Sequence, residues 1–177
     1  TEDIQGRHMA GIPALADSAY DIAGFASFDL KKGLAIVSIT VSDVIASAKI
    51  LPTSYGIIPT IKGNRLTFEV DKPQHVTVEI NGDHIRSLHL FVNPEEKDIP
   101  NPSDPNVIYF GPGIHEITSV PVSDNQTVYI AGGAIVRGVV DANDPMNRNP
   151  SFVMRGKNIT FRGRGIFDQG AIPRLNG

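Results

Sequence analysis

The sequence predicts an all-β protein, an antiparallel β-sandwich followed by the first coils of a right-handed parallel β-helix. Short runs of alternating polar and apolar residues, separated by turn signals, fill the first half of the 177-residue chain. A proline-rich segment then interrupts that pattern, and a glycine-containing motif recurs in the second half. No stretch of useful length has the apolar period of a helix.

The first half has five segments with the pattern of a β-strand. They are either rich in β-branched residues or strictly alternating, which is typical of buried and half-buried strands. These segments are residues 34–41, 44–51, 65–70, 75–80 and 87–92. Asn81-Gly82 predicts a hairpin turn, because both residue types tolerate a positive φ. Residues 1–20 are weakly patterned, and His8-Met9 is either native sequence or a remnant of cloning.

Residues 96–106 are predicted to connect two β units, residues 1–95 and 107–177. The segment holds Pro100, Pro102 and Pro105, it follows Pro94, and its start lies within a charged run at residues 95–98. Proline removes a backbone donor and fixes φ, so no central strand can run through this segment. The alternative is a long surface loop within a single domain.

The second half repeats one motif three times, with offsets of 21 and 31 residues. The copies are Val107-x-Tyr109-x-Gly111-x-Gly113, Val128-x-Ile130-x-Gly132-x-Ala134 and Ile159-x-Phe161-x-Gly163-x-Gly165. Each is a short strand that ends in a corner of small residues, where glycine permits a sharp change of direction. Periods of this size are typical of solenoids, in which each repeat stacks on the next. The alternative is three ordinary β-arches of a sandwich.

Composition excludes several classes of function. The chain has no Cys, so it has neither a disulfide framework nor a thiol nucleophile, and its net charge of −3 argues against a nucleic-acid partner. No apolar stretch reaches the length of a membrane helix. The five histidines are not spaced as metal ligands, and His89, between Leu88 and Leu90, is predicted to be structural or solvent-facing. We expect no metal, no cofactor and no membrane partner.

The acidic residues are the remaining candidates for chemistry. Asp141 and Asp144 flank a predicted loop, and Asp168 follows the third glycine corner. Sugar hydrolysis needs two carboxyl groups about 5 to 9.5 Å apart, and stacked coils can bring distant residues that close. Asp168, with Arg164 at the same corner, is therefore a candidate substrate-binding residue. The alternative is that Asp168 caps its own turn through backbone hydrogen bonds.

Several segments resemble the pectin-lyase-like glycoside hydrolases. Residues 107–117 and 126–138 resemble the entry into the β-helix of these enzymes. Residues 158–168 are similar to the next coil, where the family often has Gly-x-Gly-x-x-Asp-Gly, although Gln169 replaces the final glycine. Residues 81–94 resemble the sandwich that precedes the helix in the dextranase and isopullulanase group. The polygalacturonase group shares the helix signals but not so clearly that sandwich.

The chain departs from the family at the catalytic elements. These enzymes carry their catalytic carboxylates on later coils, partly in a Trp-x-Asp or Asn-Thr-Asp element, and this chain has neither Trp nor Asn-Thr-Asp. No catalytic residue can therefore be carried over by position. Residues 171–177 are short and contain Pro173, so they cannot cap a coil. We expect residues 151–172 to need a partner, first the remainder of the β-helix in the same or another chain, and second another copy.

The resemblance implies the N-terminal scaffold portion of a polysaccharide-degrading glycoside hydrolase. Its substrate would be a polysaccharide or oligosaccharide, cleaved without a cofactor by carboxylates outside this chain. The resemblance also implies a secreted or periplasmic location. The first alternative is a non-catalytic carbohydrate-binding or assembly module, which would bind glycans without cleaving them. A second alternative is a tailspike-like structural β-helix, which would form trimers.

Overall fold

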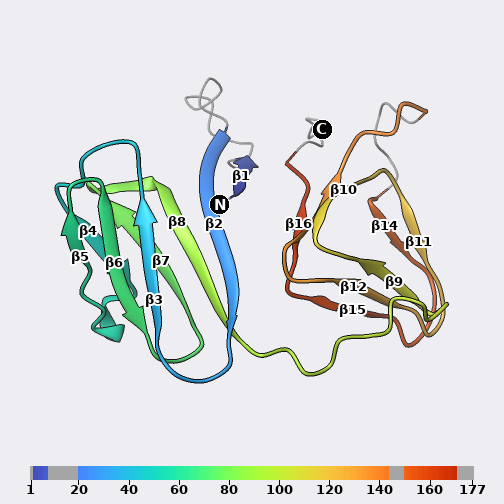
Figure 1. Cartoon of the computed structure of the whole chain (residues 1–177). Helices are drawn as coiled ribbons and strands as arrows, with labels where there is room; N and C mark the ends of the chain where they lie inside the picture. Colours follow the sequence, from blue (N-terminus) through green and yellow to red (C-terminus); the bar gives the residue numbers. More distant parts are fainter. Residues whose placement is uncertain (1, 8–19, 144–149, 171–177) are drawn as a thin grey trace. The chain divides into compact units, whose positions relative to one another are not determined.

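The chain is all-β in the computed structural model, which describes residues 2–7, 20–143 and 150–170 (Figure 1). These residues contain no α-helix, and their one helical element is the 3-10 turn η2 (Thr53–Tyr55). The chain divides into two compact units, Thr1–Lys97 and Asp98–Gly177, and this boundary falls inside the predicted connector. No helix in the described ranges is long and apolar enough to cross a membrane.

The described residues of the first unit form eight strands in two sheets. The strands are β1 (Glu2–Arg7), β2 (Tyr20–Leu30), β3 (Ala35–Thr40), β4 (Ala48–Leu51), β5 (Thr60–Lys62), β6 (Arg65–Val70), β7 (Gln74–Ile80) and β8 (Asp83–Pro94). One sheet has the order β1-β2-β8-β7-β4, and the other has the order β3-β6-β5. All five predicted segments therefore contain a strand.

Alternation along the strands produces the core of the first unit. In β6, Leu66, Phe68 and Val70 are buried, whereas Arg65 and Glu69 on the opposite face are exposed. The buried residues of β4, β6, β7 and β8 form one cluster to which both sheets contribute. Each fully buried aliphatic or aromatic side chain contributes about 1.5–3 kcal/mol to the stability of this unit.

The turn at Asn81-Gly82 is confirmed, and it also holds a neighbouring loop. Both residues have positive φ, 55° and 75°. The Asn81 side chain accepts hydrogen bonds from the backbone N–H groups of Ala46 (2.7 Å) and Ser47 (3.1 Å), and it donates one to the Val44 carbonyl (3.0 Å). Residues 44–47 are consequently a loop, so the strand predicted over 44–51 is shortened to β4.

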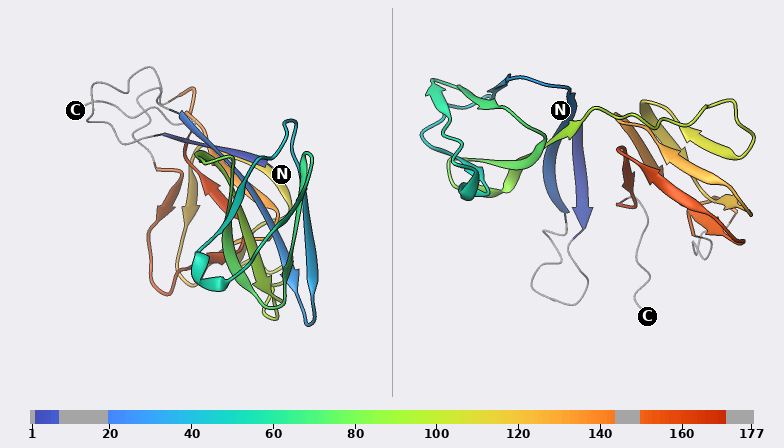
Figure 2. Two further views of the ribbon diagram at one scale, coloured as in Figure 1. Left: turned by 90° about the vertical axis from the view of Figure 1, so that its left-hand side faces the viewer. Right: turned by 90° about the horizontal axis from the view of Figure 1, so that it is seen from below.

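Three strands of the first unit, β1, β2 and β5, lie outside the predicted segments, and one pairing differs in direction. β2 was not predicted because its Ala, Gly and Ser residues weaken the strand signal, and β5 is only three residues long. β2 pairs with β8 in parallel, so the prediction of a wholly antiparallel unit is wrong at this pair. β1 lies beside β2 at the end of the five-stranded sheet (Figure 2).

In the second unit, the described residues form eight short strands in three parallel sheets. They are β9 (Val107–Phe110), β10 (Gly113–Ile117), β11 (Val120–Val122), β12 (Thr127–Ile130), β13 (Ala134–Gly138), β14 (Phe152–Met154), β15 (Thr160–Gly163) and β16 (Ile166–Asp168). The sheet orders are β15-β12-β9, β10-β13-β16 and β11-β14. Every pairing between these strands is parallel.

The predicted repeat has the correct register after each corner and the wrong register before it. After the corner, Gly113 lies opposite Ala134 and Ile135 lies opposite Ile166, as the offsets of 21 and 31 require. Before the corner, Thr127 lies opposite both Val107 and Thr160, offsets of 20 and 33. The corners differ in length, and this accounts for the change in offset between the strands before and after each corner. A motif that is aligned without gaps cannot show such a change.

The repeats are also joined by matching polar and aromatic side chains. Asn125 and Asn158 both have positive φ, and Asn158 Nδ2 donates a hydrogen bond to Asn125 Oδ1 (3.1 Å). Tyr109 and Tyr129 stack with their ring centroids 5.1 Å apart, and the Arg162 guanidinium lies 5.2 Å from the centre of the Tyr129 ring. Side chains of like character therefore stack from one repeat to the next.

Candidate functional site

Asp168, the first candidate from the sequence, has both carboxylate oxygens engaged. It is the last residue of β16 and is buried. Its Oδ1 accepts a hydrogen bond from the backbone N–H of Gly170 (2.8 Å), which is the turn-capping role anticipated as the alternative. Its Oδ2 accepts from Arg137 Nε (3.2 Å) on the neighbouring strand β13. The structure therefore gives this carboxylate a structural role.

Asp168 belongs to a charged row that crosses three strands. Parallel register places Glu116 of β10, Arg137 of β13 and Asp168 of β16 side by side. Adjacent strands lie about 4.8 Å apart, so the two acidic residues are separated by about 10 Å of sheet, and Arg137 lies between them in the register. The offsets of the repeat pair these residues, but the motif contains only small and apolar positions, and this row was therefore missed from the sequence.

The other acidic candidates and Arg164 lie apart from this row. Arg164 is half-buried in the corner before β16, and its backbone N–H donates to the Ile130 carbonyl (2.9 Å). Asp141 accepts a hydrogen bond from the Asn143 backbone (2.8 Å), and Asp144 lies outside the described residues. The contact of Arg164 and Asp168 with a substrate remains a prediction.

Three histidines of the described chain, His75, His89 and His115, have structural contacts, whereas His84 is exposed. His89 is half-buried and hydrogen-bonds Thr77 Oγ1 (3.0 Å), as its alternation predicted. His115 Nε2 lies 2.6 Å from the Gly111 carbonyl oxygen, and its ring packs edge-on against Phe110. Among the described residues, no three His, Asp or Glu side chains form a group that can hold a metal. His8 lies outside the described residues.

An apolar surface is exposed where the three parallel sheets end. We call it the end face, and it consists of Met154, Phe161 and Phe167, which are 49%, 41% and 38% exposed. They lie on β14, β15 and β16, each of which is the last strand of its sheet within the described chain. The Phe152 ring packs edge-on against the rings of Phe161 (5.1 Å) and Phe167 (5.2 Å). The end face thus combines aromatic surface with strand edges.

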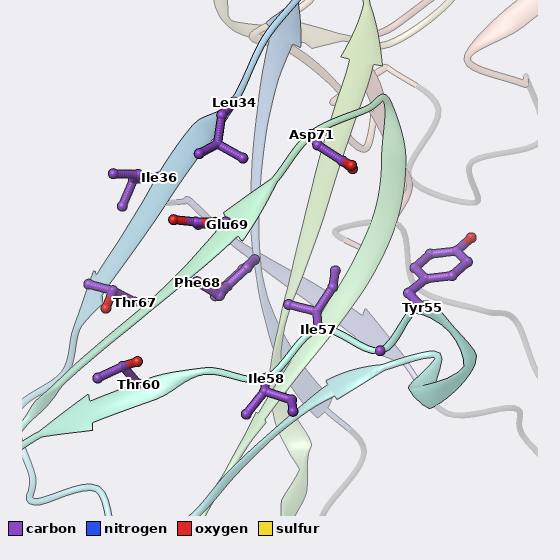
Figure 3. Close-up of a pocket in the computed structure, with 11 residues that line it drawn as sticks. Leu34, Ile36, Tyr55, Ile57, Ile58, Thr60, Thr67, Phe68, Glu69 and Asp71 are labelled. Atoms are coloured by element: carbon purple, nitrogen blue, oxygen red, sulfur yellow. The ribbon is translucent and has the colours of Figure 1, made fainter.

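A pocket of about 550 Å³ lies on the three-stranded sheet of the first unit (Figure 3). Strands β3, β5 and β6 and the chain that follows η2 form its walls. Its most exposed apolar members are Ile58 (86%), Ile36 (70%) and Leu34 (56%). Large apolar side chains that gather at one exposed place are typical of a binding surface.

The polar groups of this pocket are an aromatic hydroxyl, two threonines and two carboxylates. Tyr55 stands at one side of the pocket and Asp71 lies apart from it, whereas Glu69 points towards Ile36 (Figure 3). Thr60 and Thr67 are opposite one another on β5 and β6. Within the described chain, the side chains of Tyr55, Glu69 and Asp71 make no hydrogen bond or ion pair, so their polar atoms are free to receive a ligand.

Sequence reasoning anticipated only part of this pocket. The alternation of residues 65–70 placed Thr67 and Glu69 on the exposed face of their strand, which is where they lie. Tyr55 and Ile58 come from an irregular segment after the strand β4, and no periodic pattern reports where such a segment folds.

Neither models of protein families nor curated protein sequences gave a match when they were compared with this chain.

Proposed function

We propose that this chain is the N-terminal scaffold portion of a polysaccharide-degrading glycoside hydrolase of the pectin-lyase-like kind. In this proposal the first unit is a β-sandwich, and the second is the first coils of a right-handed parallel β-helix. The stacked parallel sheets and the asparagine pair between repeats support the second part. The proposal follows the sequence resemblance, and it includes a secreted or periplasmic location.

The end face is the observation that carries this proposal. A coil of a solenoid is stable when the next coil covers its apolar stack and pairs with its strand edges. Met154, Phe161 and Phe167 present such an uncovered stack, beside the edges of three parallel strands. A further coil would bury these rings and extend all three sheets.

The described residues support a scaffold role more than a catalytic one. The usual mechanism of glycoside hydrolysis needs one carboxyl group as a proton donor and a second as a nucleophile or base. Both oxygens of Asp168 are bound to structural donors, and Arg137 lies between Asp168 and Glu116 in the register. The catalytic carboxylates of this proposal therefore belong to later coils.

Sedimentation and hydrogen exchange test the scaffold proposal on the 177-residue chain. We expect self-association that depends on concentration, with weakly protected amides at residues 159–167 in the monomer. The double variant Phe161→Arg, Phe167→Arg should sediment as a monomer, whereas Ile85→Arg, an exposed residue of the first unit, should not change the behaviour. A monodisperse wild-type monomer with well-protected amides at residues 159–167 would contradict the proposal, and a discrete trimer would favour the tailspike-like alternative.

Reducing-sugar assays test the absence of catalysis. We expect no release from dextran, pullulan or polygalacturonate by the chain alone. Release that Asp168→Asn abolishes would overturn the scaffold proposal and make Asp168 catalytic.

The pocket of the first unit favours a second candidate, a non-catalytic carbohydrate-binding module. A sugar ring has an apolar C–H face and many hydroxyl groups. The pocket offers the Tyr55 ring, the aliphatic side chains and two unpaired carboxylates as matching surfaces.

Affinity electrophoresis in gels that contain each polysaccharide should show retarded migration. Tyr55→Ala should abolish the retardation, and Ile85→Ala, an exposed residue outside the pocket, should not. Equal migration with and without polysaccharide would reject this candidate.

A further inference from the structure

Strand β3 is the outermost strand of the three-stranded sheet, and one of its edges is unpaired in the described chain. It pairs with β6 only. The backbone N–H of Val41 donates to the Asn64 carbonyl (3.0 Å), which continues the ladder with β6 by one residue. Because alternate residues of an antiparallel strand direct their N–H and C=O groups to opposite sides, those of Ile36, Ser38 and Thr40 point to the free edge.

An apolar groove of about 440 Å³ runs along this free edge. Its floor comes from the five-stranded sheet, and its wall comes from the inward-facing residues of β3. The main apolar lining residues are Ala26, Phe28, Val37, Ile39, Leu88 and Leu90. All of them except Leu90 remain only half-buried, although they belong to the apolar cluster of this unit. The groove is therefore an incomplete part of the core.

The groove and the edge together match one kind of occupant, an extended polypeptide strand. Unpaired N–H and C=O groups at every second residue are complementary to the backbone of another strand. The side chains of that strand would alternate between the groove and solvent, so every second residue should be aliphatic. Residues 35–40 contain no charge and no proline, the devices that commonly protect an exposed edge from pairing.

Charge indicates how the solvent-facing residues of the occupant are ordered. On β6, Glu69 lies opposite Ile36 and Arg65 lies opposite Thr40, so the exposed face of the sheet is acidic at one end and basic at the other. A strand with a basic residue beside Ile36 and an acidic residue beside Thr40 complements both ends. A second copy joined edge to edge would place its own residues 35–40 there, and these contain no charged residue to complement either end.

We propose that the free edge of β3 and the adjacent groove bind an extended segment of a separate partner polypeptide by strand addition. The segment adds a fourth strand to the β3-β6-β5 sheet, and its aliphatic residues complete the core over β2 and β8. This interaction is independent of the proposed glycan function.

The proposal can be tested with the full chain and a defined peptide. The probe is acetyl-Asp-Val-Thr-Val-Lys-Val-amide with a fluorescent label, and its binding is followed by fluorescence anisotropy. The control has the same composition with its three valines adjacent, which destroys the alternation. We expect saturable binding of the probe only, together with slower hydrogen exchange at the amides of Ile36, Ser38 and Thr40.

Ser38→Pro is the discriminating variant, with Ser38→Ala as its matched control. Proline removes the edge-facing N–H of residue 38 without removing a bond to β6, which an edge strand tolerates. We expect Ser38→Pro to weaken binding by about tenfold or more and Ser38→Ala to bind like the wild type. Ala26→Leu, which narrows the groove away from the edge, should also weaken binding. Equal affinity for wild type and both weakening variants, or no saturation up to about 1 mM, would overturn the proposal.

Discussion

Gly163 occupies a position that no other residue fits. Its φ is +136°, and a Cβ built on it would overlap the carbonyl oxygen of Ile130 on the preceding repeat. Gly163→Ala combines backbone strain with overlap against main chain that cannot move aside. We expect it to lower the free energy of unfolding by about 3 kcal/mol or more, measured by urea denaturation.

Gly111→Ala is the control for this prediction, because Gly111 has the same place in the first sequence motif but lies after the end of its strand β9. Its φ is not in the positive range, and its nearest neighbour would be a Tyr109 ring carbon at 3.7 Å. We expect a change of less than about 1 kcal/mol. Similar losses for the two variants would show that the close approach at Gly163 is not responsible.

The Asp168 carboxylate has two roles, an ion pair with Arg137 and a turn cap, and two variants distinguish them. Asp168→Ala removes both the ion pair and the bond to the Gly170 N–H, whereas Asp168→Asn retains an acceptor for that N–H. Because Arg137 is about one-third exposed, solvent screens part of the loss. We expect the alanine variant to cost about 1–2 kcal/mol in urea denaturation and the asparagine variant roughly half of that. Equal costs would contradict the turn-capping role.

At the level of single residues, the local sequence pattern predicts contacts between residues that are close in the sequence. The turn chemistry of Asn81-Gly82 and of Asp168 was predictable, because these side chains bond to backbone within a few residues. Arg137 and Asp168 are 31 residues apart, and only the parallel register makes them neighbours. A contact of that kind depends on corner lengths, which a sequence motif does not report.

The β7–β8 hairpin depends on Asn81 for more than its turn. Asn81→Gly keeps the positive φ and loses three hydrogen bonds to residues 44–47. We expect a loss of about 2–3 kcal/mol in thermal or urea unfolding, because each such bond contributes about 1 kcal/mol. Asn81→Ala should be less stable than Asn81→Gly, since alanine also disfavours positive φ. The opposite order would mean that the backbone conformation contributes nothing.

The same hairpin has a carboxylate with a lowered pKa. The backbone N–H of Arg86, and to a lesser degree its guanidinium, hold the pKa of Asp83 below its ordinary value of 3.8. The contribution of Asp83 to stability is therefore present above pH 3.8 and is lost as the pH falls through the lowered pKa. In an NMR titration, Arg86→Ala should raise the Asp83 pKa only part of the way, because the backbone bond remains. A wild-type pKa at or above 3.8 would contradict this.

At the scale of elements, alternation was sufficient for β6 and β7 and insufficient elsewhere. Both strands keep one face in the core, so their period appears in the sequence. β2 has small residues in its centre, and residues 44–47 have a strand-like composition but are held as a loop by Asn81. The pocket residues show the same difference. Strand alternation predicted the position of Thr67, but it could not predict that of Tyr55, which lies outside a strand.

The division into two units at Lys97 predicts where a protease cuts first. Lys97 is exposed, and it is the last residue of the first unit. Limited trypsin digestion should produce fragments 1–97 and 98–177, as mass spectrometry would show, and Lys97→Gln should delay their appearance. Early cleavage within the strands of either unit, at Lys49 or Arg137 for example, would argue against two compact units.

For the whole molecule, the all-β class was predictable, whereas the sheet order was not. The strand signals are local, but the pairing of β2 with β8 joins segments at opposite ends of the first unit. The pocket likewise assembles residues 34–36, 55–60 and 67–71 from three separate segments. Such arrangements follow from how the strands pack, and no single segment contains that information.

The parallel pairing of β2 with β8 has a consequence for how the chain folds. Gly24 lies opposite Leu88, so the five-stranded sheet closes over 64 residues, whereas β9 and β12 meet over only 20. The longer closure costs about 1 kcal/mol more in chain entropy, and distant parallel pairing is slow. During synthesis, β2 therefore cannot pair with β8 until β8 has left the ribosome. Each repeat of the second unit, in contrast, can pair with the repeat that was synthesised just before it.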